Sequence, residues 1–241
     1  MCTVVVLIRP GHDTPVMLAA NRDEMLARRW DPPSAWWPDR KGIIGGRDRE
    51  GGGTWLGMNR HGVVAAVLNR PGSLGPAPGK RSRGELPLLA LDHASAGAAA
   101  DAVSALDAGA WRAFNMVLAD HAGAVFVRGL GQGRPQARPL PEGVSMVTAH
   151  DPNDLESPRV ARHLPRFRAA QPPDADEWRA WRTLLADQSG GAGEQLNVTP
   201  RAGFGTGSSS LIGLPREGAP CWLFAPGPPD ATDYAPVILA S

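Results

Sequence analysis

The chain has 241 residues, of which 42% are hydrophobic and 20% charged, and its formal net charge at pH 7 is +1. This nearly neutral balance produces no field that would attract nucleic acid or an anionic membrane surface, so we expect neither as a partner. The apolar content suffices for a sizeable core, and the length alone allows one large domain or two small ones.

Cysteine usage and the N-terminal segment indicate the compartment. Two cysteines, Cys2 and Cys221, are too few for a disulfide scaffold, and no Cys-x-x-Cys or Cys/His spacing indicates zinc. The first apolar run is short and has no basic leader before it, so we expect neither a signal peptide nor a membrane span. Together these features predict a soluble protein of the reducing cytoplasm.

The first elements expected along the chain form a hairpin. Residues 2–9 are β-branched and apolar at alternating positions on both faces, which is typical of a strand buried on both sides. Pro10-Gly11-His12-Asp13 is a turn signal, and residues 16–20 form the returning strand. Because Cys2 begins one strand and Asn21-Arg22-Asp23-Glu24 ends its neighbour, we expect the hairpin to bring them side by side.

The rest of the chain predicts further hairpins and four helices. Residues 26–41 indicate an aromatic-rich loop, and the glycines 51–53 are not followed by the Gly-Lys-Ser/Thr of a phosphate-binding loop. Ser82 and Glu85 form a capping-box pattern that opens a helix. The expected helices cover 82–92, 95–106, 157–170 and 174–187, and the expected strands cover 55–58, 63–68, 114–120, 124–130, 144–148, 209–214, 221–224 and 237–239. This order predicts a single α+β domain of antiparallel sheets over residues 1–241.

Cys2 is a candidate nucleophile because of its position. A small second residue allows methionine aminopeptidase to remove Met1, which leaves the Cys2 thiol beside its own free α-amine. An α-amine has a pKa of about 7.7–8.0 and can take the thiol proton in place of a histidine. The alternative for an isolated cysteine at this place is a small hydrophobe at the start of a strand.

Three short stretches occur together, and their combination resembles a known family. They are Met1-Cys2-Thr3, Asn21-Arg22-Asp23-Glu24, and residues 51–72 with Gly-Gly-Thr-Trp-Leu-Gly and Leu-Asn-Arg-Pro-Gly. The pattern resembles the NRDE family, also called the transport and Golgi organization protein 2 family, and the likeness continues through residues 114–120 and 205–211. It implies the αββα sandwich of the N-terminal-nucleophile hydrolases, whose related members are the choloylglycine hydrolases and penicillin V acylases.

The resemblance also implies roles for individual residues. Cys2 would be the nucleophile, Asp23 would orient its α-amine, and Asn69 in Leu68-Asn69-Arg70-Pro71-Gly72 would help to form the oxyanion hole. A side-chain amide aimed at developing charge can supply about 3–4 kcal/mol of transition-state stabilisation. From the residues alone, Asn69 is equally readable as a turn residue before Pro-Gly.

Four further residues are expected to contact the substrate: Asn21, Arg22, Trp55 and His150. A guanidinium binds carboxylates bidentately, so Arg22 is a candidate clamp for a substrate carboxylate, with a structural ion pair as the alternative. His150 beside Asp151 could form an acid–base pair or a turn element.

The chain departs from the hydrolases at three places. Their further asparagine corresponds to Ala149, and their arginine near the serine-rich strand falls at Gly207. Their early arginine corresponds to Ala20, and Arg22 could replace it only from a different face of the strand.

The sequence therefore predicts an N-terminal-cysteine amidohydrolase that acts on a non-peptide C–N bond of a small molecule. Such an enzyme needs no metal or organic cofactor, because the amine transfers the proton. The alternative is a non-catalytic haem, lipid or acyl-CoA binding and trafficking protein that uses the same cleft, a role that the resemblance also implies; the loop of Trp30, Trp36 and Trp37 could stack a flat ligand. A scaffold that serves as an interaction module is the third interpretation, and the oligomeric state stays open.

Overall fold

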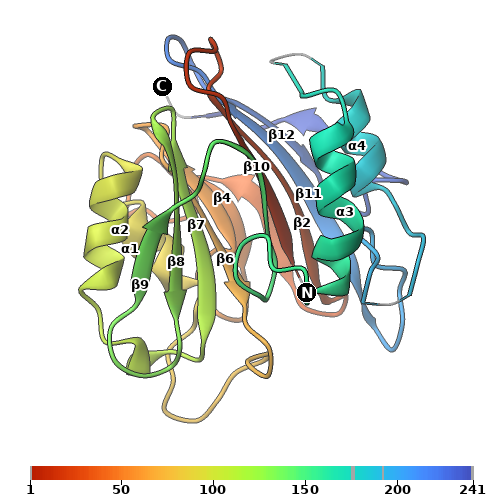
Figure 1. The fold of residues 1–241 in the computed structure, drawn as a ribbon. Coiled ribbons are helices and arrows are strands. Elements are labelled where there is room, and N and C mark those ends of the chain that lie inside the picture. Colours follow the sequence, from red (N-terminus) through yellow and green to blue (C-terminus); the bar gives the residue numbers. More distant parts are fainter. Residues whose placement is uncertain (1, 175–176, 192, 240–241) are drawn as a thin grey trace. The chain divides into compact units, whose positions relative to one another are not determined.

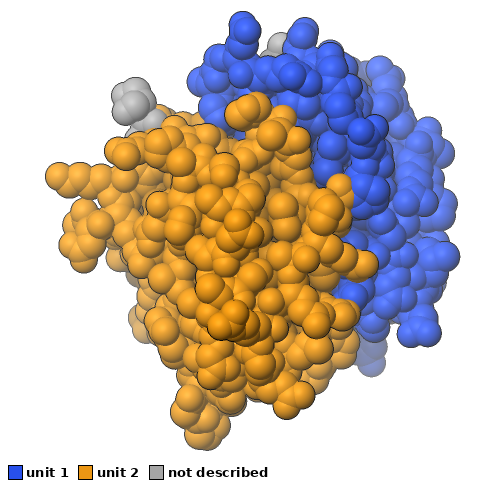
Figure 2. Space-filling view, turned by 60° about the vertical axis from the view of Figure 1, so that its left-hand side comes forward, with its two compact units in different colours: residues 1–27, 141–237 blue, residues 28–140, 238–241 orange. Residues whose placement is uncertain are grey.

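The computed structural model describes residues 2–174, 177–191 and 193–239, and the chain divides into two compact units. Unit 1 comprises residues 1–27 and 141–237, and unit 2 comprises residues 28–140 with 238–241. Figure 2 colours unit 1 blue and unit 2 orange. The chain thus leaves unit 1 after its first hairpin and returns to it more than a hundred residues later. That the two units behave as one domain stays a prediction.

Unit 1 contains a six-stranded antiparallel sheet in the order β10-β1-β2-β11-β12-β13. The N-terminal hairpin lies near its centre, with β2 between β1 and the long strand β11 (Figure 1). The strands are β1 (Thr3–Ile8), β2 (Val16–Met25), β10 (Gly143–Val147), β11 (Phe204–Leu214), β12 (Cys221–Ala225) and β13 (Ala235–Pro236).

Helices α3 (Pro158–Ala169) and α4 (Arg179–Leu185) cover one face of this sheet. Val5 and Leu7 of β1 point to that face and pack with Val160 and Phe167 of α3. Alternate residues of a strand point to opposite faces, so the odd-numbered positions of β1 face the helices. The helix-covered face is the core of unit 1, and Trp181 of α4 is fully buried in it.

Unit 2 contains a seven-stranded antiparallel sheet in chain order from β3 to β9. Helices α1 and α2 pack on it, and Leu86 with Trp111 belongs to its buried core. Its elements are β3 (Trp30–Ser34), β4 (Ile43–Asp48), β5 (Leu56–Asn59), β6 (Val64–Asn69), α1 (Glu85–Ala90), α2 (Ala96–Ser104), the short 3-10 helix η1 (Ala108–Ala110), β7 (Phe114–Asp120), β8 (Gly123–Gly129) and β9 (Gln136–Pro139). No helix in the described part of the chain is long and apolar enough to cross a membrane.

Most predicted elements are present, and the differences have physical causes. The returning strand does not end at residue 20, because β2 is paired on both sides and continues through the Asn-Arg-Asp-Glu run to Met25. Strands β3, β4 and β9 were not predicted; their residues are rich in proline, glycine and arginine. The strand expected at 237–239 is wrong, since the last strand is the two-residue β13.

The glycine-rich segment of unit 2 is explained by packing. A Cβ on Gly53 would lie 2.2 Å from the backbone of Gly84, and the amide of Thr54 donates to the Gly84 carbonyl at 2.9 Å. Two backbones therefore cross here at a distance that only glycine permits. Helix α1 begins at Glu85 with Gly84 as its N-cap, so the predicted capping role of Ser82 is wrong, and its hydroxyl accepts from the Gly84 amide instead.

Candidate active site

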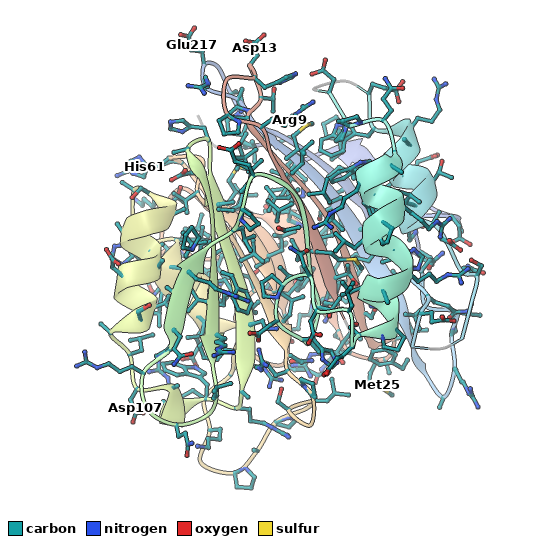
Figure 3. The ribbon with its side chains drawn as sticks, viewed as in Figure 1. Arg9, Asp13, Met25, His61, Asp107 and Glu217 are labelled. Carbon is teal, nitrogen blue, oxygen red and sulfur yellow. The ribbon has the colours of Figure 1, made fainter. Side chains whose placement is uncertain are left out.

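The predicted nucleophile lies at one end of the unit 1 sheet. Cys2 immediately precedes β1, whose first residue Thr3 pairs with Asn21 of β2, and Asp23 pairs with Thr206 of β11. Figure 3 shows Met25 at this end of unit 1, whereas Asp13 and Glu217 mark the hairpin tips at the opposite end. The first hairpin thus brings Cys2 and the Asn-Arg-Asp-Glu run together, as the sequence predicts.

The Cys2 thiol donates a hydrogen bond to the backbone carbonyl of Asp23 over 3.6 Å. Burial raises the pKa of the Cys2 thiol above its ordinary value, and the Asp23 carboxylate raises it further. The Arg22 guanidinium and the bond to the Asp23 carbonyl act in the opposite direction. Because the net shift is upward, the thiol needs a base close by before it can act as a nucleophile.

The Asp23 carboxylate is the centre of a buried polar network. Its Oδ2 lies 2.9 Å from Nη1 of Arg159 on α3, and the two side chains are 0% and 2% exposed. The same Nη1 donates to the Thr3 hydroxyl at 2.9 Å. The Asp23 Oδ1 accepts from the Thr206 hydroxyl at 2.7 Å. Both oxygens of the Asp23 carboxylate are therefore fixed in position by hydrogen bonds from buried side chains.

Strand alternation sorts these groups onto two faces of the unit 1 sheet. Thr3 and Asp23 point to the face covered by α3, where they meet Arg159. Arg22, one residue before Asp23, therefore points to the other face, and so does Cys2 if the alternation of β1 is extended by one residue. The expectation that Arg22 lies on a different face from Ala20 is wrong, because two residues apart in one continuous strand share a face.

Asn21 is buried and bonded within unit 1. Its Nδ2 donates to the carbonyls of Leu185 and Leu196 at 2.9 and 3.0 Å, and its Oδ1 accepts from the Ser209 hydroxyl at 2.7 Å. Tyr234 donates in turn to Ser209 at 2.7 Å. Both amide hydrogens are used by the protein, so Asn21 ties β2 to the end of α4. Its contact with a substrate stays a prediction.

The segment after β10 carries Ala149 and His150. Val147, the last residue of β10, pairs with Val4 of β1, and the buried Ala149 follows in a bend. The resemblance implies an asparagine at the position of Ala149. The next residue, His150, is partly exposed, and its Nδ1 lies 3.5 Å from Oδ2 of Asp154. His150 as a substrate-binding residue stays a prediction.

Two predicted site residues belong to unit 2. Asn69 is the last residue of β6 and pairs with Phe114 of β7. Trp55 lies just before β5 and packs edge-on against Trp30, with the ring centroids 5.6 Å apart. Gly46 lies so close to the Trp55 ring that a Cβ added to this glycine would be 2.3 Å from the ring. The roles of Asn69 and Trp55 toward a substrate stay predictions.

Arg159 and Thr206 were missed at the level of sequence, although Arg159 left a signal. The buried face of α3 carries Val160, His163, Leu164 and Phe167, and Arg159 falls on the same stripe. A charged residue on a buried helical face needs an acidic partner, and Asp23 provides it. The described residues contain no group of three or more His, Cys, Asp or Glu side chains able to hold a metal ion.

Comparison with known proteins agrees with this architecture. A family model described as Transport and Golgi organisation 2 matches residues 1–169. No curated protein sequence matches the chain. Among solved structures, a Caenorhabditis elegans ortholog of N-acylethanolamine-hydrolyzing acid amidase is similar with a TM-score of 0.60 and 12% identity, covering 88% of this chain and 92% of its own.

Two bacterial enzymes are also similar. Penicillin V acylase from Agrobacterium tumefaciens has a TM-score of 0.52 and 16% identity, with 93% of this chain and 83% of the acylase covered. A mutant conjugated bile acid hydrolase from Clostridium perfringens has a TM-score of 0.54 and 12% identity, with 100% and 97% covered. These likenesses confirm the predicted fold class, an α+β fold of antiparallel sheets of the N-terminal-nucleophile hydrolase type.

Proposed function

Since the chain belongs to the Transport and Golgi organisation 2 family, we propose that it is an N-terminal-cysteine amidohydrolase acting on a non-peptide C–N bond of a small molecule. The observation that carries the proposal is the geometry around Asp23. The Cys2 thiol bonds to the backbone of this residue, while its carboxylate is fixed by Arg159 and Thr206. A carboxylate held this rigidly beside a terminal cysteine is suited to orienting an amine.

The reaction uses one residue as nucleophile and base. After removal of Met1, the α-amine of Cys2 takes the thiol proton, and the sulfur attacks the amide carbonyl carbon. The resemblance assigns the binding of the oxyanion of the tetrahedral intermediate to the side-chain amide of Asn69. The ammonium then returns the proton to the leaving nitrogen as the C–N bond breaks. Water, deprotonated by the same amine, then adds to the thioester carbonyl. The C–S bond breaks, the carboxylic acid is released, and the ammonium returns its proton to the Cys2 sulfur.

The raised pKa of the Cys2 thiol is consistent with a mechanism in which the α-amine of the same residue acts as the base. A thiol with an upward-shifted pKa is a poor nucleophile by itself. An amine on the same residue removes its proton without any movement of a second side chain. Arg22 lies on the thiol's face of the sheet, where a guanidinium would bind a carboxylate of the substrate. Trp55 and His150 are proposed as further substrate contacts, whereas Asn21 positions β2, because its amide is bonded within unit 1.

The test begins with the intact mass of the purified protein, which must show loss of Met1. Hydrolysis of a panel of N-acyl amides is then compared between wild type, Cys2→Ala and the matched control Cys221→Ala. We expect Cys2→Ala to lose activity by on the order of 10³-fold or more while keeping its fold. Cys221→Ala should retain it, and equal hydrolysis by wild type and Cys2→Ala would contradict the mechanism.

One observation favours a second function, non-catalytic binding of haem, lipid or acyl-CoA at the same site. Ala149 is a buried alanine at a position where the resemblance implies an asparagine, and burial raises the pKa of the Cys2 thiol. The missing amide and a thiol that ionises less readily both weigh against catalysis and therefore favour binding. A haem titration followed by absorbance tests this function, because a saturable Soret shift at micromolar haem would support it and a flat titration would count against it.

A further inference from the structure

An irregularity in β11 changes which face of the unit 1 sheet its side chains occupy. Thr206 of β11 pairs with Asp23 of β2. Ser208 pairs with the preceding residue of β2, Arg22, so the register between the two strands shifts at Gly207. Three residues of β11 therefore stand opposite two residues of β2, which is the arrangement of a β-bulge with Gly207 as its extra residue. Such a bulge re-aims the side chains that follow it.

The bulge supplies side chains of β11 to both faces of the sheet. In a regular strand, residues that are two positions apart share a face. Asp23 and Arg22 are successive residues of β2 and point to opposite faces, so their partners in β11 do the same. The Thr206 hydroxyl donates to the Asp23 carboxylate on the face covered by α3. Ser208 therefore points to the other face, beside Arg22, whereas without the extra residue it would share the face of Thr206.

The three consecutive serines after the bulge differ in their hydrogen bonds. Ser209 donates to Oδ1 of Asn21 at 2.7 Å. Ser210 accepts from Nε1 of Trp222 at 3.2 Å. Ser208 is 1% exposed, and its hydroxyl has no hydrogen-bond partner among the residues that the structure describes. Nearly all buried polar groups of folded proteins are hydrogen-bonded, so this hydroxyl calls for an explanation, and a ligand would provide one.

The Arg22 guanidinium lies against the bulge and close to the thiol. A Cβ added to Gly207 would lie 3.9 Å from Nη1 of Arg22, so the guanidinium is in van der Waals contact with the backbone one residue before Ser208. Its positive charge also lowers the pKa of the Cys2 thiol, which places both groups in the same surroundings. A cationic donor and a buried hydroxyl donor therefore stand next to each other on the thiol's face of the sheet.

We propose that Ser208 and Arg22 form a two-donor site for a carboxylate, which the bulge places on the same face of the sheet as the Cys2 thiol. A guanidinium donates two parallel bonds to a carboxylate, and a serine hydroxyl supplies one more to a lone pair that remains. Both groups are buried, and bonds to a charged group are stronger there than in water. Its identification as a substrate site rests on the amidohydrolase function proposed above, whereas the binding of a carboxylate does not.

The spacing of the strands limits where the carboxylate lies in the substrate. Strand β2 carries Arg22, and its two neighbours are β1, which follows Cys2, and β11, which carries Ser208. Neighbouring strands lie about 4.8 Å apart, so the carboxylate site is only one to two strand spacings from the thiol. In an N-acyl amino acid the carboxylate carbon is two bonds beyond the scissile nitrogen and spans a short distance of this kind. The substrate class is therefore an amide whose leaving group is a short amino acid.

Binding to Cys2→Ala, measured by titration calorimetry, tests the site without any hydrolysis. The two ligands are N-octanoylglycine and N-octanoylethanolamine, which share the acyl chain and differ in a carboxylate against a hydroxymethyl group. We expect the glycine conjugate to bind at least thirtyfold more tightly. Adding Ser208→Ala should weaken the glycine conjugate by about tenfold, the usual effect of losing one hydrogen bond to a charged group, and leave the ethanolamine conjugate unchanged.

Two further variants separate binding from a merely structural role. Ser208→Thr keeps the hydroxyl and should keep the preference for the glycine conjugate. Ser210→Ala, on the same face but bonded to Trp222, is the matched control and should change the affinities for the two ligands by the same factor. If Ser208→Ala does not fold, Ser208→Cys takes its place, because a thiol has nearly the same size and is a weak donor.

Three results would overturn the carboxylate site: equal affinity of Cys2→Ala for both ligands, no measurable binding of the glycine conjugate, or an equal loss for both ligands in Ser208→Ala. Hydrolysis of the same two compounds by wild type is measured separately. A carboxylate preference that depends on Ser208, found in a wild type that hydrolyses neither compound, would refute the amidohydrolase function and leave the carboxylate site intact.

Discussion

Two carboxylates, one in each unit, are held by arginine in contrasting surroundings. Asp23 in unit 1 is paired with Arg159, whose side chain is 2% exposed. Asp31 in unit 2 is covered too, but its partners Arg47 and Arg49 are 37% and 51% exposed. Both ions of a buried pair have lost their hydration shells, whereas an arginine exposed to water keeps most of its hydration. We therefore propose that the Asp23 pair serves to place a group, and we expect the Asp31 pairs to contribute modestly to stability at the surface.

The largest effect that this comparison predicts is for Arg159→Met. It leaves Asp23 buried without its guanidinium, and breaking a buried pair from one side costs about 3–5 kcal/mol. Urea denaturation should show this loss of unfolding free energy, and any hydrolytic activity should fall with it. Arg168→Met, on the exposed side of the same helix, is the matched control and should change stability little; equal losses in both variants would contradict the special status of Arg159.

The next effect is expected for Thr206→Val. The substitution keeps the shape of the side chain but removes the donor to Asp23 and the acceptor for the Val198 amide. Leaving buried polar groups unsatisfied costs about 1–3 kcal/mol. Denaturation measures this cost, with Thr183→Val, an exposed threonine of α4, as the control. A loss no larger than that of the control would mean that Asp23 is not held through Thr206.

How far the site follows from the sequence depends on the separation of its members along the chain. Cys2 and Asp23 lie in one hairpin, and a turn signal with two apolar runs suffices to predict their proximity. Arg159 and Thr206 reach Asp23 across 136 and 183 residues, respectively, and no local pattern encodes such contacts. Only the position of Arg159 on the buried stripe of α3 indicated that it needed an acidic partner.

The fold follows the same rule. Strands β1, β7 and β8 are apolar runs bounded by turns, and they were predicted almost to the residue. Strand β2 was predicted too short, because its polar second half is stabilised by pairing with β11, which comes almost two hundred residues later. The exposed strand β9 has no apolar pattern and exists through its pairing with β8. Pairing between segments that are distant along the chain therefore accounts for the strand residues that the local sequence pattern did not predict.

A smaller effect is expected for Arg22→Gln, which tests the electrostatics of the thiol's own face. The Arg22 guanidinium lowers the pKa of the Cys2 thiol, so its removal should raise that pKa and slow alkylation at a fixed neutral pH by a few-fold. The rate of iodoacetamide modification of Cys2, followed by mass spectrometry, measures the change. Arg9→Gln is the control, since Figure 3 places Arg9 toward the end of the unit 1 sheet opposite Met25. An unchanged alkylation rate in Arg22→Gln would mean that the Arg22 guanidinium does not influence the pKa of the Cys2 thiol.

The smallest effect is predicted for Arg49→Gln at the surface pairs of unit 2. The hydrogen bond from Arg49 lowers the pKa of Asp31, with Arg47 adding to the shift. A lowered pKa in the folded state contributes stability above the ordinary aspartate value, and that stability is lost as the pH falls through the folded value. Arg49→Gln should therefore destabilise the protein at neutral pH by less than Thr206→Val does, and the difference from wild type should shrink both in acid and at high salt. Melting temperatures at several pH values and salt concentrations check this; a salt-independent loss as large as that of Arg159→Met would abolish the distinction between the two carboxylates.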